Sequence, residues 1–295
     1  MDCPNICRIH VSRTAAEVQD FPHWTPPGGT LGTLVADAAR RAAALRPRLR
    51  ELERHAAAAP PAPSFAGALR GETVAVIAEI KRRSPSKGDI NPGLSVVDQA
   101  AAYAGGGAAA LSILTEPTRF GGTEADLVAA RGAVSLPLLK KDFHVAPVQL
   151  VEARALGASA ALLIARALSP TSLRALAALG ADLGLDVLVE VRDERELDVA
   201  LSTEAPVVGV NNRNLETLVI DLAAGDRIVP LIPPDRLAVF ESGVSTVAEV
   251  ERAADAGADA VLVGSSVSAA ADPVAAVRAL CGVARRSRAA VGARR

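Results

Sequence analysis

The sequence predicts an α/β fold, a (β/α)8 TIM barrel with an N-terminal helical extension. The first observation is repetition: from residue 72 onward, a short apolar segment, a polar loop and an Ala- and Leu-rich segment follow one another eight times. Eight strand–helix units are the number that closes such a barrel. The second is composition, since 50% of the 295 residues are hydrophobic but only 2% are aromatic. Ala, Val, Leu and Ile must therefore fill the core, as in parallel sheets covered by helices.

The eight predicted strands are short apolar segments. Their spacing of roughly 20 to 30 residues leaves room for a crossover helix between parallel neighbours. A doubly wound open sheet is the alternative, but no GxGxxG fingerprint follows the first strand. The strands are predicted at residues 74–80, 110–115, 136–141, 161–165, 186–191, 207–211, 237–242 and 260–265.

The segments between the strands carry helix signals. Ser169 followed by Pro170 is typical of an N-cap and a first helical turn. Thr246 and Glu249 have the spacing of a capping box. Three of these helices end in glycine, which commonly follows a helix C-terminus, at Gly157, Gly184 and Gly257.

Four regions are expected along the chain. Residues 1–30 are rich in Pro and Gly and are expected to be a flexible N-terminal segment. Residues 31–71 are expected to be the helical extension, because an apolar helical face precedes the helix-breaking APPAP segment at 59–63. The barrel domain is expected at 72–285, and a basic, disordered tail at 286–295. The apolar helical face comprises Leu31, Leu34, Val35, Ala38, Ala42 and Leu45.

Charge and cysteine content restrict the function classes. The net charge of -1 gives no general attraction to nucleic acid or to acidic membranes. No signal peptide opens the sequence and no apolar segment is long enough to span a bilayer, so we expect a cytoplasmic protein. Three cysteines in a chain of this length argue against a disulfide framework. Cys3, Cys7 and His10 match no zinc-site spacing, so no metal is expected.

Polar side chains follow the predicted strands at their carboxyl ends. In the segment AEIKRRSPSKG (78–88), Glu79 and Lys81 end the first strand, although buried strands rarely carry charges. The active sites of (β/α)8 barrels lie at this end of the strands. We therefore expect these groups to point into one mouth, where carboxylates and lysines shift one another's pKa values. The strand-end residues are Glu79, Lys81, Thr115, Glu116, Lys141, Asp142, Arg166, Glu190, Asn211, Glu241, Ser242, Gly264 and Ser265.

Two glycine-containing loops predict a phosphate site. The segments ESGV (241–244) and GSSV (264–267) follow the seventh and eighth predicted strands. Glycine lets backbone N–H groups approach an anion, and the start of a following helix favours negative charge. In barrels of this kind, phosphate frequently binds at this pair of loops.

Eight motifs resemble, in their order along the chain, those of the indole-3-glycerol-phosphate synthase family of tryptophan biosynthesis. The resemblance runs from about residue 65 to residue 280. It implies a carboxy-lyase that converts 1-(2-carboxyphenylamino)-1-deoxyribulose 5-phosphate into indole-3-glycerol phosphate, CO₂ and water by Lys/Glu acid–base catalysis. It also implies a small sugar-phosphate substrate, no metal and no cofactor. The motifs are IAEIKRRSPSKG, ALSILTEPTRFGG, PLLKKDF, ALLIARAL, VLVEV, GVNNRNLETL, FESGV and VLVGSS.

The resemblance also implies catalytic roles. Lys141 matches the lysine that protonates the substrate carbonyl during condensation, and Glu190 matches a glutamate of the dehydration steps. Lys81, beside Glu79, would hold the anionic groups of the substrate or act as the dehydration acid. Three further residues would position the hydroxyl groups and the lysines: Asn211, Glu241 and Ser242.

Three groups of residues are implied to bind the substrate. The anthranilate ring and its carboxylate would meet Ser84 and Pro85. The walls of that apolar pocket would come from four residues that could equally be plain core: Phe120, Phe143, Leu162 and Leu218. The phosphate would meet Arg213, Gly243, Gly264 and Ser265.

Some assignments stay open from the residues alone. Strand alternation sends either Lys140 or Lys141 inward, and the family pattern Lys-Asp-Phe favours Lys141. Trp24 is either a cap on the aromatic pocket or a loop residue. The loop at 85–93 is expected to be flexible, so that substrate can enter and product can leave.

Alternative functions follow from the same residues. One is a ring-closing enzyme that acts on a substituted anthranilate in a specialised pathway. Another is a non-catalytic ligand-binding barrel, which the retained Lys81, Lys141 and Glu190 disfavour. Phosphoribosylanthranilate isomerase chemistry needs a Cys/Asp pair, yet no cysteine lies between Cys7 and Cys281. The composition suits a monomer and a homodimer equally.

Overall fold

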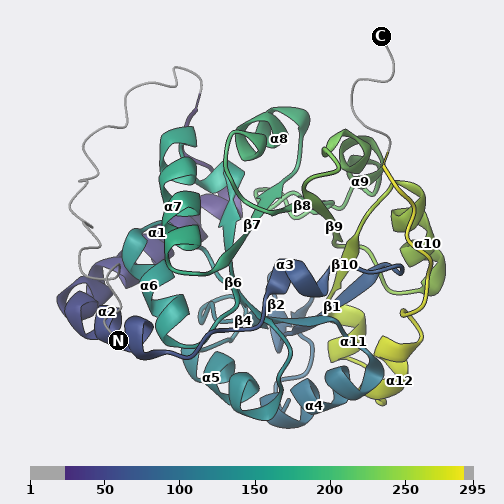
Figure 1. Cartoon of the computed structure of the whole chain (residues 1–295), viewed down its shortest axis with the longest axis horizontal. Coiled ribbons are helices and arrows are strands. Elements are labelled where there is room, and N and C mark those ends of the chain that lie inside the picture. Colours follow the sequence, from purple (N-terminus) through teal and green to yellow (C-terminus); the bar gives the residue numbers. More distant parts are fainter. Residues whose placement is uncertain (1–23, 289–295) are drawn as a thin grey trace, which may run out of the picture.

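Eight parallel strands close into a barrel in the computed structural model, which describes residues 24–288 (Figure 1). Each strand pairs with the next strand of the barrel along the chain, and the first pairs with the last. Every strand overlaps one predicted segment, so the predicted (β/α)8 fold is confirmed. The barrel strands are β1 (Ala75–Ile80), β4 (Ala110–Leu114), β5 (Leu138–Lys141), β6 (Ala160–Ile164), β7 (Asp186–Val191), β8 (Val207–Asn211), β9 (Leu237–Glu241) and β10 (Ala260–Val263).

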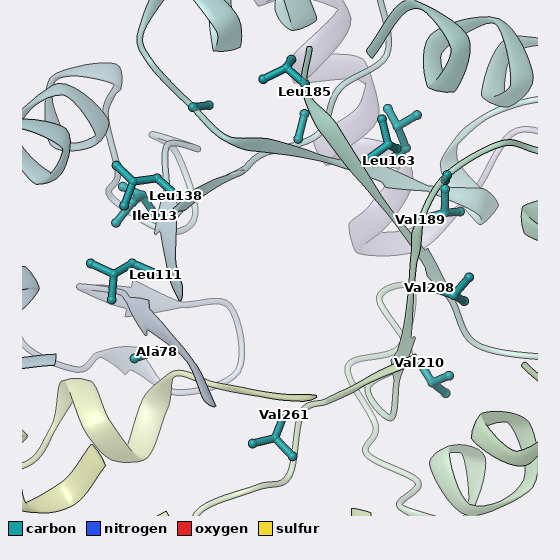
Figure 2. Close-up of a cluster of buried hydrophobic side chains, with 14 of the residues drawn as sticks. Ala78, Leu111, Ile113, Leu138, Leu163, Leu185, Val189, Val208, Val210 and Val261 are labelled. Atoms are coloured by element: carbon teal, nitrogen blue, oxygen red, sulfur yellow. The ribbon is translucent and has the colours of Figure 1, made fainter. Parts of the chain in front are cut away.

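Both faces of these strands are buried, and successive side chains alternate between the faces. In β7, Val189 belongs to the layer between strands and helices, whereas Leu188 packs inside the barrel. Figure 2 shows Val189, Val208 and Val210 pointing outward from the ring of strands. Because the side-chain period of a strand is two, Glu190 faces the same way as Leu188, into the barrel.

Helices of the crossover connections, together with two short helices after the last strand, surround the barrel. The predicted signals are present: the Ser169 hydroxyl accepts a hydrogen bond from the Ser172 amide, and Thr246 and Glu249 form a capping box. Gly157, with a φ of 83°, has the left-handed conformation that lets the chain leave α6 and enter β6. These helices are α4 (Val96–Gly106), α5 (Glu124–Ala133), α6 (Pro147–Ala155), α7 (Pro170–Asp182), α8 (Glu194–Leu201), α9 (Ala223–Ile228), α10 (Val247–Asp255), α11 (Ser265–Ser268) and α12 (Pro273–Arg278).

The extension before the barrel contains two helices in series. Helix α1 (Gly29–Leu45) continues through a 3-10 turn (Arg46–Arg48) into α2 (Leu49–Ala58), which packs against α6. Helix α1 begins two residues before the predicted start of the extension. Four residues of the predicted apolar face are fully buried: Leu31, Leu34, Ala38 and Ala42.

A short helix, α3 (Phe65–Ala68), closes the amino-terminal end of the barrel. Phe65 and Leu69 are completely buried and pack with the inward side chains of the strands. The Ala66 amide donates to the carboxylate of Asp186, at the start of β7, over 2.9 Å. In Figure 1, α3 lies across the centre of the ring. The carboxyl ends of the strands are thus left as the open end.

Residues 286–288, predicted to belong to a basic, disordered tail, are held against the barrel: Arg286 pairs with Asp255, and the nearly buried Arg288 pairs with Asp259 at 2.7 Å. Cys3, Cys7 and His10 lie outside the described residues. Within residues 24–288, no helix has both the length and the apolarity that crossing a membrane requires.

Candidate active site

A cavity of about 360 Å³ opens at the carboxyl ends of the barrel strands. Every residue to which the resemblance assigned a catalytic or substrate-binding role lines it. They come from all eight strand ends and the loops that follow, so the fold brings together side chains up to 186 positions apart, from Glu79 to Ser265. Asp142, which was expected in the mouth as a strand-end residue, lines the cavity too. The cavity also has lining residues that were not predicted: Ser86, Lys87, Leu114, Ile164, Leu215, Ile220, Val244, Ser245, Glu249, Leu262 and Ser266.

The two lysines at the end of β5 point to opposite sides of the strand. Lys141 Nζ lies 3.2 Å from Glu241 Oε2 and 3.5 Å from Glu190 Oε2, inside the cavity. Lys140 is buried behind the strand, where its Nζ lies 2.8 Å from Glu152 Oε2 on α6. Strand alternation therefore leaves Lys141 as the lysine of β5 that can reach a ligand.

A second ion pair lies at the end of β1. Lys81 Nζ is 2.8 Å from Glu79 Oε1, and the Ser112 hydroxyl donates to Glu79 Oε2 over 3.3 Å. Gly264 makes room for this pair, because a Cβ at that position would lie 2.5 Å from Glu79 Oε1 and 2.8 Å from Lys81 Nζ. The glycine predicted for a phosphate loop thus also accommodates a charged pair.

Burial and mutual attraction shift the pKa values in this cluster. Burial, opposed by Lys141 and reinforced by Glu190, raises the pKa of Glu241 to about 8. Burial lowers the pKa of Lys141, but attraction to Glu241, Glu190 and Glu79 outweighs burial, and the net shift is upward. Three carboxylates face two ammonium groups, so one carboxylate tends to keep a proton while Lys141 stays cationic.

Asn211 and Ser242 hold Glu190 in place. The Asn211 side-chain amide donates to Glu190 Oε1 over 3.0 Å, and its carbonyl oxygen accepts from the Ser242 hydroxyl over 2.8 Å. The same oxygen accepts from the Arg213 backbone amide over 2.9 Å. This chain of hydrogen bonds connects the ends of β7, β8 and β9 and orients the Glu190 carboxylate toward Lys141.

The phosphate loops of the prediction lie on one side of the mouth. Gly243 has a φ of 84°, which lets the ESGV segment turn sharply after β9. Ser265 begins α11 directly after Gly264, and the adjacent Ser266 hydroxyl is buried without a hydrogen-bond partner among residues 24–288. An unpaired buried hydroxyl is a donor available to an anion. Arg213, whose guanidinium donates to the Leu218 carbonyl over 3.1 Å, faces the same cavity.

Apolar side chains form another part of the wall. The rings of Phe120 and Phe143 lie 6.4 Å apart, tilted by 38°. Leu162 is buried at 3% exposure, and Leu218 has a left-handed backbone with a φ of 66°. A leucine in that conformation is uncommon, and such strain is typical of segments near functional sites.

The loop after β1 covers part of the cavity as a small hairpin. Strands β2 (Arg83–Ser84) and β3 (Gly88–Asp89) pair antiparallel, and Pro85 lies in the turn between them. The Ser84 hydroxyl accepts from the Lys87 amide over 3.2 Å. The sequence predicted a flexible loop here but not this pairing, because two-residue strands leave no periodic signal.

Three strand-end residues that were expected in the mouth do not line the cavity, and for them the prediction was wrong. The Thr115 hydroxyl donates to Asp142, and Glu116 accepts from the Arg119 and Phe120 amides at 2.7 and 3.0 Å. Arg166 lies outside, 3.0 Å from Glu216. These polar groups instead order the loops, and one of those loops carries Phe120. Trp24 is not among the cavity's lining residues either.

Some of the missed lining residues have a sequence signal. Leu114, Ile164 and Leu262 have the inward parity of their strands, so alternation alone could have found them. Leu215 and Ile220 come from the irregular loop after β8, where no periodicity indicates which side chains turn inward.

Comparisons with known proteins show the family to which the chain belongs. A sequence model described as indole-3-glycerol phosphate synthase matches residues 33–280. "Indole-3-glycerol phosphate synthase 2" of Streptomyces coelicolor is 47% identical over 259 residues, which cover 86% of this chain and 99% of that protein. An indole-3-glycerol phosphate synthase of a Nocardioides species is 49% identical over 223 residues, 76% of this chain and 84% of that protein.

Solved structures support the fold alone. A crystal structure of 3-hexulose-6-phosphate synthase superposes with a TM-score of 0.55 at 17% identity, covering 70% of this chain and 98% of that one. The thiamine phosphate pyrophosphorylase of Pyrococcus furiosus gives a TM-score of 0.52 at 16% identity, over 70% and 93% of the two chains. The family model and the relatives at nearly half identity show the family as well as the fold. The chain belongs to the indole-3-glycerol phosphate synthase family.

Proposed function

We propose that this chain closes the indole ring of indole-3-glycerol phosphate with Lys141 as the first proton donor. The substrate is 1-(2-carboxyphenylamino)-1-deoxyribulose 5-phosphate, and the other products are CO₂ and water. The observation that carries the proposal is the position of Lys141, a cation held between Glu190 and Glu241 in a cavity that also has aromatic walls and two glycine loops. Belonging to the family supports the same reaction.

Condensation requires a proton at the ketone oxygen of the substrate. The ring carbon that carries the carboxylate attacks the ketone carbon, and the oxygen that was double-bonded becomes a hydroxyl. Lys141 supplies that proton, because the surrounding carboxylates keep its ammonium group charged in a buried site. The electron pair of the breaking bond to the carboxylate restores the aromatic ring as CO₂ leaves.

Dehydration requires an acid and a base. The new hydroxyl leaves as water after taking a proton, while the carbon beside the nitrogen loses one. We assign the base to Glu190, which Asn211 holds at 3.0 Å, and the acid to Lys81, whose ammonium group pairs with Glu79 at the end of β1. Summed over both stages, one proton enters from solvent for each CO₂ released. Glu79, Glu241 and Ser242 position these groups.

Binding divides the substrate between the two sides of the cavity. The anthranilate ring lies against Phe120 and Phe143, with its carboxylate toward Ser84 and Pro85. Leu162 and Leu218 complete that apolar wall. The phosphate meets the basic side chain and the loops at the opposite side: Arg213, Gly243, Gly264 and Ser265.

A steady-state assay with this substrate tests the proposal. We expect a rise in indole fluorescence that requires no added metal or cofactor, with one CO₂ released per indole formed. A purified, folded protein that binds the substrate but forms no indole would overturn the proposal.

A further inference from the structure

The N-terminal extension reaches the catalytic strand through one arginine. Arg41 of α1 donates two hydrogen bonds to the Asp142 carboxylate, from Nη1 to Oδ2 over 2.9 Å and from Nη2 to Oδ1 over 2.7 Å. The Asp142 side chain has no exposed surface, and that of Arg41 is 25% exposed. A paired, two-point contact of this kind fixes orientation as well as distance.

Asp142 is the residue between two groups of the proposed site. Lys141 precedes it and Phe143 follows it, and both of these line the cavity. The Asp142 carboxylate also accepts from the Thr115 hydroxyl and from the Phe143 amide, each over 2.8 Å. Because Asp142 directly follows the last residue of β5 and accepts from the Phe143 amide, fixing its carboxylate restrains the backbone from which Lys141 and Phe143 project.

Among residues 24–288, no other cation near Asp142 is free to replace Arg41. Lys140 Nζ lies 3.9 Å from Asp142 Oδ2, but it is bound at 2.8 Å by Glu152. Burial would raise the pKa of Asp142, yet Arg41 and Lys140 outweigh burial and hold that pKa well below its usual range. Asp142 therefore keeps its charge at any pH at which the enzyme works, and Arg41 is the cation that hydrogen-bonds to it.

We infer that Arg41 is a positioning residue of the active site, which aligns Lys141 and Phe143 through Asp142. The inference rests on the proposed function, because alignment matters only if Lys141 delivers a proton. Helix α1 would then help to align the catalytic lysine, in addition to covering the barrel. A contact that served stability alone would leave turnover by the folded protein unchanged.

The test compares Arg41→Ala with Arg40→Ala. Arg40 is adjacent on α1, but its side chain is 73% exposed and pairs only with Asp37 one turn earlier among the described residues. For Arg41→Ala we expect kcat to fall about 10- to 100-fold, the effect of displacing a catalytic group by about 1 Å. KM should change much less, and Arg40→Ala should behave as wild type. Guanidinium ion, far below denaturing concentration, should restore part of the kcat of Arg41→Ala.

Conservative variants separate alignment from charge. Arg41→Lys keeps a cation but cannot bridge both oxygens, so its kcat should lie between those of wild type and Arg41→Ala. If Arg41→Ala fails to fold, Arg41→Met combined with Asp142→Asn removes both charges and should show the same loss of kcat. Unchanged kcat in a folded Arg41 variant, whatever its melting temperature, would overturn the inference.

Amide hydrogen exchange provides a readout that needs no substrate. The Phe143 amide donates to Asp142, so its exchange should become faster in Arg41→Ala and stay unchanged in Arg40→Ala. If wild type turned over no substrate, the proposed function would fail, whereas faster exchange would still show that Arg41 orders this segment. Exchange that is equal in all three proteins would contradict the alignment.

Discussion

The protonation of Glu241 decides the net charge of the cavity. Its Oε2 lies 3.2 Å from Lys141, while its Oε1 is buried without a hydrogen-bond partner among the described residues. Burial is the largest cause of its raised pKa of about 8, against an ordinary value of 4.5. In the substrate-free protein it therefore keeps a proton at neutral pH, and this proton offsets the excess of carboxylates over lysines.

The raised pKa of Glu241 makes stability depend on pH in a definite direction. The folded protein holds this proton more tightly than the unfolded chain, so the stabilisation is fully present below pH 4.5 and is lost as pH rises toward about 8. In Glu241→Gln the neutral group cannot titrate. Urea unfolding of the substrate-free proteins should be measured at pH 6 and pH 9. Between these pH values, the free energy of unfolding of the variant relative to wild type should rise by on the order of 2 kcal/mol. Parallel pH dependences would contradict the assignment.

Among the single elements, strand β8 makes room for the Glu241 carboxylate because its residue 209 is a glycine. A Cβ at Gly209 would lie 2.0 Å from Glu241 Oε1 and 2.9 Å from a Leu188 methyl group. The neighbouring strands therefore place a carboxylate in the space that glycine leaves. Gly264, directly after β10, does the same for Glu79 and Lys81.

The substitution Gly209→Ala should consequently disturb both packing and catalysis. We expect the free energy of unfolding to fall by about 1 to 3 kcal/mol, as in other overpacked cores, and kcat to fall because Glu241 must move away from Lys141. Gly132→Ala is the control, since nothing lies within 4 Å of the added Cβ on helix α5. That change should leave kcat unaltered and stability equal or slightly higher. Equal behaviour of the two variants would show that the space at Gly209 has no importance.

At the scale of the whole molecule, the strong periodic signals were predictable and the long-range pairings were not. Strand alternation and the position of polar groups at strand ends identified the barrel and placed Lys141 inside it. The same pattern could not separate Lys141 from Thr115, because a strand-end polar group can turn either into the mouth or back onto its own loop. The partner of Asp142 lies 101 positions away on the extension, at a residue that the sequence marks only as helical.

The loops account for the remaining differences. The β2–β3 hairpin and the inward-facing Leu215 and Ile220 depend on contacts at the barrel mouth. Their local sequence carries no periodic signal that predicts these positions. The order of Arg286 and Arg288 likewise depends on Asp255 and Asp259, which a basic tail alone does not reveal. Local patterns predict elements, whereas contacts between elements decide where loops and termini lie.

The central claim is that Lys141 donates the proton that starts ring closure at this mouth. Its most direct test is release of CO₂ and formation of indole by wild type and Lys141→Ala, with folding checked by circular dichroism. We predict that kcat of the variant falls at least about 100-fold, the usual contribution of a general acid, while the protein stays folded. Full activity in Lys141→Ala would contradict this role and move the proton donor to Lys81, the other lysine of the barrel strand ends that lines the cavity.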